Sequence, residues 1–158
     1  MIRKLSLDEV LKLIKMSPEQ TVFDWKTDFI VPNNQDKQSE LIKDVTAIAN
    51  SISLSPGFIV YGVDPRRPDP LLGISNSYDD AKLQQLFKNK VKPAIDFIYY
   101  EISFGPKQIG VIQVTPVRKR PHIISVDIGK VRNGQIPIRR GSSTDGVKIE
   151  DLLEMFYG

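Results

Sequence analysis

The sequence predicts an α+β fold with a mixed, largely antiparallel sheet packed with about four helices. Apolar residues recur at helical spacing in four separate segments, the first near residue 10 and the last near residue 150. Short runs rich in β-forming residues lie between these segments, and most of them follow one another in the second half of the chain. Because strands and helices do not alternate regularly, the order excludes a repeated β-α-β fold with a parallel sheet.

The first helix is predicted over residues 6–16. Ser6 and Glu9 have the spacing of a capping box, and apolar residues follow at helical intervals. Pro18 then ends the helix, because the residue before a proline disfavours the helical conformation. Residues 21–29 are rich in β-formers and predict the first strand.

A long helix is predicted over residues 36–52, with Asp36 as its N-cap. The continuous apolar run at 58–63 predicts a short strand that is covered on both faces. A proline-stiffened loop at 64–70 follows, and a third helix is predicted from residue 77 or 78 to residue 91.

The second half of the chain is predicted to consist mainly of short strands. Residues 97–103 and 108–114 flank a four-residue turn that contains Gly105, which predicts a β-hairpin. Further short strands are predicted at 123–128, 130–132 and 136–140, with Asn133-Gly134 as a turn and a last helix over 147–156.

Composition limits the chemistry. The chain has no cysteine and one histidine, His122, which excludes disulfides, thiolate catalysis, zinc fingers and multi-histidine metal sites. No apolar run approaches the roughly 20 residues that span a bilayer, and residues 1–16 lack the apolar block of a signal peptide. We therefore expect a cytoplasmic protein with one domain over residues 1–158.

Positive charge is concentrated in the C-terminal third. Residues 1–106 hold 13 Lys and Arg against 14 Asp and Glu, whereas residues 107–148 hold nine against two. Segregated positive charge is what a nucleic-acid backbone or an acidic partner requires. The alternative is an ordinary solvated basic face.

Four residues form a candidate catalytic group. Asp24 and Lys26 are two apart on a predicted strand, so they share one face, while Glu19 precedes that strand and Asp64 follows the next one. In metal-dependent nucleases, carboxylates hold the cation and an ammonium stabilises developing negative charge. Oxygen ligands of this kind suit Mg²⁺ or Mn²⁺. The alternative is an exposed Asp24–Lys26 ion pair, a solvated Glu19 and an Asp64 that starts a turn.

Two other segments offer polar groups that could bind an anion. Lys43 lies on the long helix, where it reaches a phosphate or is simply solvated, and Asn50 is expected to bond neighbouring backbone. The small residues at 141–144 precede the last helix and form either an anion seat or a capping turn. Arg139 and Arg140 are adjacent on a strand and are therefore expected to point to opposite faces. No Gly-Lys-Ser/Thr sequence occurs, which excludes a P-loop ATPase.

Several of these segments together resemble the Schlafen AlbA-type DNA-binding domain family. The resemblance rests on residues 41–51, 57–64 and 138–144, with the acidic–aromatic–lysine triplet Asp24-Trp25-Lys26 before them, and it covers about residues 17–153. It implies the same α+β fold and a nucleic-acid-binding or regulatory module.

In the animal Schlafen proteins, related domains form an RNA-cleaving site from three carboxylates. Matched by motif, these resemble Glu19, Asp24 and Asp64, although Asp24 stands where the family typically has glutamate. Two such lobes act together in those proteins, so the resemblance implies a homodimer.

Three hypotheses follow. The first is a nucleic-acid-binding regulatory domain that contacts phosphates with its basic C-terminal region. The second is a divalent-metal nuclease, and the third is a nucleotide-sensing or protein-interaction module. The residues predicted to contact nucleic acid are Lys43, Arg118, Lys119, Arg120, Arg132, Arg139, Arg140 and Ser142.

Overall fold

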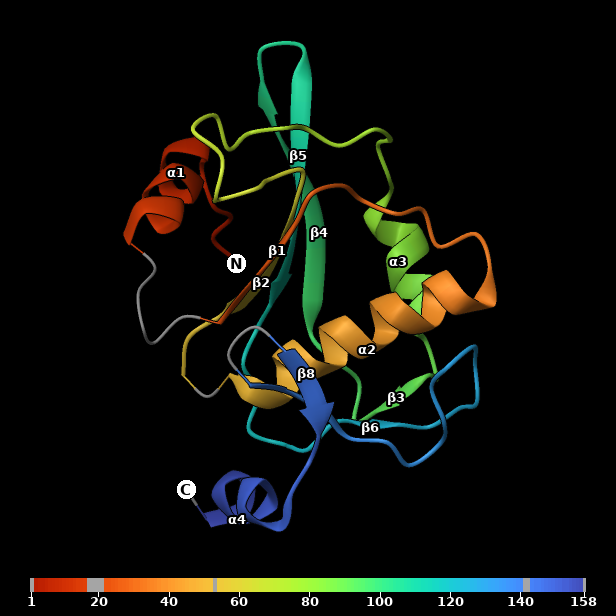
Figure 1. Ribbon diagram of the computed structural model, residues 1–158. Helices are drawn as coiled ribbons and strands as arrows, with labels where there is room; N and C mark the ends of the chain where they lie inside the picture. Colours follow the sequence, from red (N-terminus) through yellow and green to blue (C-terminus); the bar gives the residue numbers. More distant parts are fainter. Residues whose placement is uncertain (1, 17–21, 53, 141–142, 158) are drawn as a thin grey trace.

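A four-stranded sheet forms the centre of the molecule (Figure 1). The computed structural model describes residues 2–16, 22–52, 54–140 and 143–157. The order of the central strands is β1 (Phe23–Lys26), β2 (Gly57–Tyr61), β5 (Lys107–Val114) and β4 (Phe97–Phe104). β1 runs parallel to β2 and the other neighbours are antiparallel, which confirms the predicted mixed, largely antiparallel sheet.

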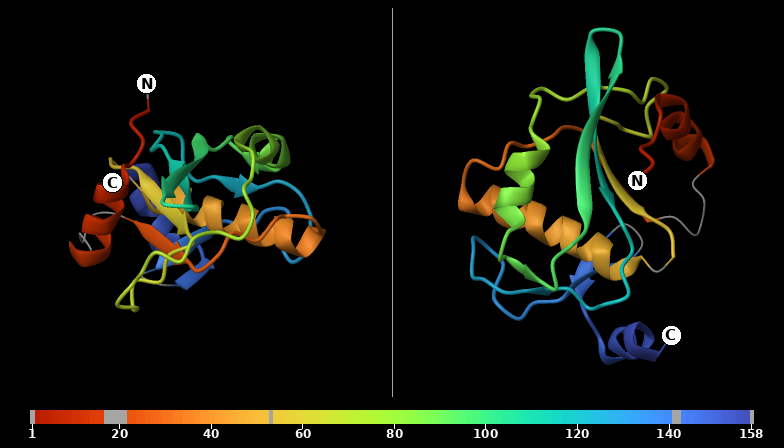
Figure 2. Two further views of the ribbon diagram at one scale, coloured as in Figure 1. Left: turned by 90° about the horizontal axis from the view of Figure 1, so that it is seen from above. Right: turned by 180° about the vertical axis from the view of Figure 1, so that it is seen from behind.

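Helices cover both faces of this sheet (Figure 2). α2 (Gln35–Ser51) and α3 (Asp80–Phe87) pack on one face, where Ile59 of β2 is fully buried. α1 (Leu7–Met16) packs on the other face, where its Val10 contributes to a second cluster with Val60. Every residue of β2 is buried, as the continuous apolar run predicts for a strand covered on both faces.

The ends of the first two helices are capped in different ways. At α1, Glu9 N donates to Ser6 Oγ and Ser6 N donates to Glu9 Oε1, each at 3.2 Å, so the predicted capping box is confirmed. At α2 the predicted N-cap is wrong: Asn34 caps the helix by accepting from Lys37 N at 2.9 Å. Asp36 lies in the first turn, where its charge favours the helix dipole.

Short elements complete the chain. β3 (Val91–Lys92) pairs with β6 (Ile123–Ile124), β7 (Pro137–Arg140) pairs with β8 (Ser143–Gly146), and α4 (Ile149–Tyr157) follows. The strands predicted over 123–128 and 130–132 are wrong beyond β6, because the chain there buries Ile128 and Val131 through one isolated bridge instead of a ladder. The third helix is shorter than predicted, since it begins after its cap Asp79 and ends at Phe87.

The segment predicted as an anion seat or capping turn before the last helix forms a strand in its described part. Residues 143–146 belong to strand β8, so α4 begins only at Ile149. Pairing with β7 uses the backbone of this segment, and the small side chains do not form a loop directly before the helix. Ser142 lies outside the described residues.

Candidate functional site

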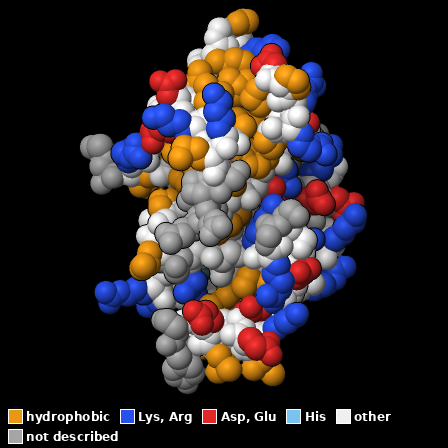
Figure 3. All heavy atoms as spheres, turned by 60° about the vertical axis from the view of Figure 1, so that its left-hand side comes forward, with side chains coloured by type: hydrophobic (Ala, Val, Ile, Leu, Met, Phe, Trp, Pro, Cys, Tyr) orange, Lys and Arg blue, Asp and Glu red, His pale blue; other side chains and the backbone are white. Residues whose placement is uncertain are grey.

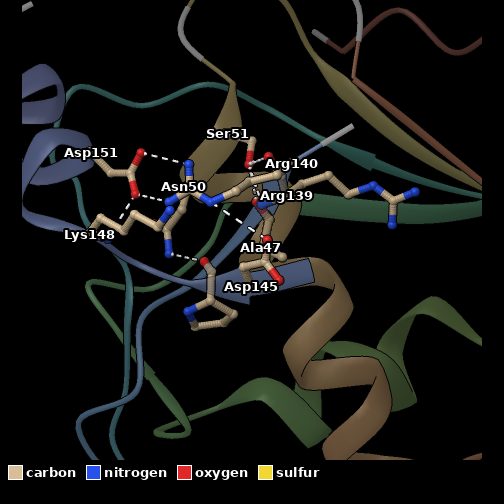
Figure 4. A network of polar contacts seen from close by, with 9 residues as sticks. Ala47, Asn50, Ser51, Arg139, Arg140, Asp145, Lys148 and Asp151 are labelled. Carbon is tan, nitrogen blue, oxygen red and sulfur yellow. Dashed lines mark hydrogen bonds and ion pairs between the residues drawn. The ribbon is translucent and has the colours of Figure 1, made fainter. Parts of the chain in front are cut away.

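Buried hydrogen bonds fasten the β7–β8 hairpin to the last turn of α2 (Figure 4). The Asn50 side chain is 1% exposed, and its Nδ2 donates to the carbonyls of His122 and Pro137 at 3.0 and 2.9 Å. Its Oδ1 accepts from His122 N at 2.7 Å. Ser51 Oγ accepts from Arg139 N at 2.8 Å. Because the Asn50 bonds are buried, the Ser51 bond is partly buried and all of them are directed at backbone, they fix β7 on α2.

The two arginines of β7 point to opposite faces, as predicted. Arg139 Nη1 lies 3.2 Å from Asp24 Oδ2 on β1. Arg140 meets Asp151 of α4 through two guanidinium nitrogens, one of them at 3.2 Å from Oδ1 (Figure 4). Asp151 Oδ2 also accepts from Lys148 N at 2.8 Å. β7 therefore joins the edge of the sheet on one side and the terminal helix on the other.

Among the described residues, Asp24 lies in a cluster of charged side chains with Lys26, Asp44 and Arg139. Lys26 Nζ lies 3.2 Å from Asp24 Oδ2 and 3.2 Å from Asp44 Oδ2, while Arg139 approaches the same oxygen of Asp24. The Asp24–Lys26 ion pair expected as the alternative is therefore present, but its Asp24 side chain is 7% exposed, so the carboxylate is buried and not on an open surface. The cluster ties β1, α2 and β7 together.

Burial and neighbouring charges shift the pKa values of Asp44 and Lys26 for different reasons. Burial raises the pKa of Asp44, and the attraction of Lys26 does not cancel that effect. Burial alone would lower the pKa of Lys26, but Asp44 and Asp24 together raise it above its ordinary value. Lys26 therefore stays protonated, whereas Asp44 takes up a proton more easily than an ordinary aspartate.

Of the three carboxylates predicted to form a site, the structure describes Asp24 and Asp64, and these two lie apart. Asp64 lies five residues beyond Ile59, which is the register partner of Asp24. Its Oδ1 accepts from the backbone and side chain of Arg66 at 3.1 and 3.3 Å, and this contact lowers the pKa of Asp64. Glu19 lies outside the described residues.

The described positions, Asp24 and Asp64, do not fit a bound Mg²⁺ or Mn²⁺. Asp24 already faces two cationic groups, which would repel a metal ion. No three His, Cys, Asp or Glu side chains within the described ranges are placed to hold a metal.

The basic residues divide into two groups. Arg120, Arg139 and Arg140 line a hollow of about 710 Å³ whose wall also includes Asn50 and Ser51. Arg120 is held there because its Nη1 donates to the carbonyl of Ile52 at 2.6 Å. The remaining predicted residues lie elsewhere: Lys43 is exposed on α2, Arg118 and Lys119 are exposed just before Arg120, and Arg132 donates to the carbonyls of Gly129 and Val131.

α4 closes one side of this hollow with two acidic residues, Asp151 and Glu154. Three apolar side chains of the same helix remain open to solvent: Ile149, Leu153 and Phe156 are 74%, 52% and 63% exposed. Apolar and acidic side chains gather at this end of the molecule (Figure 3). Sequence reasoning missed both carboxylates, although the acidic last ten residues beside a basic segment were a signal for charge pairing.

Comparisons with known proteins agree with this architecture. The family model described as "Schlafen, AlbA_2" matches residues 19–148. No curated protein matches the chain significantly. The crystal structure of the DIP2311 protein from Corynebacterium diphtheriae is similar, with a TM-score of 0.56 and 15% identity. The match covers 94% of this chain but only 27% of that one, so it shows the fold alone.

One further property concerns membranes: none of the helices in the described ranges is long and apolar enough to cross one. The family model covers most of the chain, including β1, α2, β2 and the β7–β8 hairpin that build the site. The chain therefore belongs to the Schlafen AlbA_2 family.

Proposed function

We propose that the domain binds nucleic acid through the arginine-lined hollow at the end of α2. The observation that carries this proposal is that Arg120 and Arg140, from two separate segments, line one hollow together with Arg139 of β7, whose guanidinium faces Asp24. Buried hydrogen bonds from Asn50 and Ser51 fix the backbone of β7 there. Membership of a nucleic-acid-associated family also supports nucleic-acid binding.

The chemistry of the hollow suits a phosphate group. Guanidinium groups bind phosphate with two parallel hydrogen bonds, and the geometry of that contact is the one used with a carboxylate. Arg140 already makes such a two-point contact with Asp151. A phosphate that replaced Asp151 would therefore find the guanidinium held close to the geometry it needs.

The three arginines differ in accessibility. The side chain of Arg139 is 12% exposed and that of Arg140 is 32% exposed. Arg140 and Arg120 are therefore placed to contact a phosphate directly. Arg139 contributes only its positive charge, from behind the wall of the hollow. Arg118 and Lys119, both exposed and adjacent to Arg120, would extend the path of a bound strand. Lys43 and Arg132 lie outside the hollow and are not required.

The test is a binding titration with labelled single-stranded DNA, duplex DNA and a hairpin RNA at 50 and 200 mM NaCl. Binding that weakens steeply with salt supports the proposal, because phosphate contacts dominate such affinities. Absence of binding to all three probes at the lower salt concentration would overturn it. The same mixtures, run on a denaturing gel with EDTA or Mn²⁺, report whether any strand is cleaved.

The other functional hypotheses receive less support. Among the described residues, Asp24 forms ion pairs with Lys26 and Arg139, and this arrangement does not favour the metal-dependent nuclease. Homodimer formation stays a prediction that sedimentation would test.

A further inference from the structure

A second pocket of about 110 Å³ lies beside the N-terminal half of α2. Its most buried lining residues are Tyr61, Phe29 and Leu41, and its charged lining includes Lys26, Asp44 and Lys37. The pocket thus lies beside the buried charged cluster, on the side away from the arginine-lined hollow. Neither the family match nor the sequence motifs assign a ligand to it.

The hydroxyl of Tyr61 is the feature that points to a ligand. Tyr61 is 5% exposed, and its hydroxyl finds no hydrogen-bond partner among the described residues. A buried tyrosine hydroxyl ordinarily has a partner, because leaving it without one is costly. Burial raises the pKa of Tyr61 well above its ordinary value, and the nearby Asp44 and Asp24 add to this effect, so the hydroxyl stays a donor.

The mixed charge of the lining limits what can bind. Two ammonium groups, Lys26 and Lys37, disfavour a bare metal ion, and three carboxylates, Asp28, Glu40 and Asp44, disfavour a phosphate. The ion pair with Lys26 uses Oδ2 of Asp44, which leaves Oδ1 to accept a hydrogen bond. The lining therefore suits a neutral group that carries both a donor and an acceptor.

Shape and apolar surface limit the ligand further. Phe29 and Leu41 offer apolar walls, on which a flat ring would pack. The pocket, at about 110 Å³, is smaller than the cavity of about 150 Å³ that encloses benzene, so it takes up only one edge of a six-membered ring. The Watson–Crick edge of a pyrimidine presents a donor beside an acceptor on such a ring.

The pocket and the hollow are linked closely enough to serve one strand. Asp24 Oδ2 lies 3.2 Å from Arg139, which lines the hollow, and 3.2 Å from Lys26, which lines the pocket. Asp44 and Ser51 are seven residues apart on α2, or about 10 Å at 1.5 Å per residue. The two sites therefore lie within reach of neighbouring nucleotides of one single strand.

We propose that this pocket binds an unstacked pyrimidine base of a single-stranded nucleic acid, with Tyr61 and Lys26 donating to the base and Asp44 accepting from it. The proposal rests on the proposed function, because the phosphates of the same strand would lie in the arginine-lined hollow. Single-stranded segments are required, since only there is a base edge free to enter a pocket.

The experiment compares an oligo-pyrimidine with an abasic strand of the same length, which has the same phosphates and no bases. We expect the wild-type protein to bind the pyrimidine strand about tenfold more tightly at equal salt. Tyr61→Phe is expected to reduce this preference by about threefold to tenfold, leaving binding of the abasic strand and thermal stability unchanged. Retained stability would separate a ligand contact from a structural one.

The matched control is Tyr100→Phe. Tyr100 Oη contacts Gln113 and Leu5 on the opposite face of the sheet, so this change is expected to lower stability and leave the base preference intact. Equal binding of both strands by the wild-type protein would overturn the pocket and leave the hollow standing, as would an unchanged preference in Tyr61→Phe. Binding of neither strand would overturn the proposed function and the pocket together.

Discussion

Asp24 and Arg139 come from opposite ends of the chain and meet with 3.2 Å between Oδ2 and Nη1. This contact joins an edge strand of the central sheet to the hairpin that carries the arginines. The same carboxylate oxygen lies 3.2 Å from Lys26. One buried side chain therefore positions a cation in the hollow and a cation in the smaller pocket.

Replacing Asp24 with asparagine is expected to destabilise the fold. The change leaves Lys26 and Arg139 without their shared carboxylate, and breaking a buried pair in this way costs about 3 kcal/mol. Urea unfolding measures this loss. The control is Asp64→Asn, which among the described residues removes a carboxylate bonded to the exposed Arg66, and its unfolding midpoint is expected to stay close to the wild-type value. Equal midpoints for Asp24→Asn and the wild type would contradict a structural cluster.

Asn50→Ala is expected to loosen the β7–β8 hairpin. The alanine loses three buried hydrogen bonds and leaves the carbonyls of His122 and Pro137 unsatisfied, at a cost of about 3 kcal/mol. Thermal and urea unfolding would show the loss. The exposed Asn76 serves as the control, because its replacement by alanine removes an amide from the surface. A hairpin that kept its hydrogen-exchange protection in Asn50→Ala would argue against this role.

Neutralising Arg118 and Lys119 together is expected to weaken nucleic-acid binding. Both side chains are exposed, so glutamine at these positions removes charge near the hollow without breaking a described contact. The slope of log affinity against log salt should fall in magnitude by about 1.5, because each phosphate contact contributes about 0.7 to 0.9. The matched control neutralises Arg66 and Arg67, which are exposed on a different loop. Identical slopes for the two double variants would show that charge alone, wherever it lies, governs binding.

Asp151→Asn is expected to increase affinity for nucleic acid several-fold. The carboxylate of Asp151 is hydrogen-bonded to the guanidinium of Arg140 through both oxygens. A neutral amide at that position competes less well with a phosphate for the guanidinium. The measurement is a binding titration at one fixed salt concentration. Glu150→Gln removes one charge from the same helix at an exposed position and is the control. An increase of the same size in both variants would point to general repulsion by α4.

Stability is expected to fall as the pH drops below about 6.5, through the single histidine of the chain. Burial lowers the pKa of His122, and the hydrogen bond that its Nδ1 donates to the Pro93 carbonyl at 2.7 Å only partly opposes this. Below the ordinary pKa of about 6.5 the unfolded chain therefore binds more protons than the folded one, which lowers the free energy of unfolding. Urea unfolding at several pH values between 5 and 7.5 measures the effect. His122→Gln should flatten the dependence in that window, and an unchanged dependence would assign it to other groups.

Local patterns predicted the elements whose signals are short-range. The apolar run of β2 and the turn between β4 and β5 each lie within a few residues of sequence, and both elements formed where expected. The strand predicted over 123–128 ends at Ile124, because the residues beyond it are hydrogen-bonded within loops and not in a sheet. Asn34 displaced Asp36 as a cap because both residue types suit that position and the backbone of the preceding loop decides between them.

The site was less accessible to sequence reasoning than the fold. The opposite orientation of Arg139 and Arg140 follows from strand geometry and was predictable. Their partners were not, because Asp24 and Asp151 reach them only through tertiary packing. Asp44 is a similar case: its place on α2 was readable, but its contact with Lys26 depends on how the helix lies over β1.

The ion pair between Arg140 and Asp151 has a consequence for counterions. In a domain whose arginines face only solvent, each phosphate contact releases about one cation from the nucleic acid. Here Arg140 would exchange a carboxylate for a phosphate, and the freed Asp151 would gather a cation from solution in return. The net number of released ions would therefore be smaller than the number of arginines in the hollow, by about one for this residue.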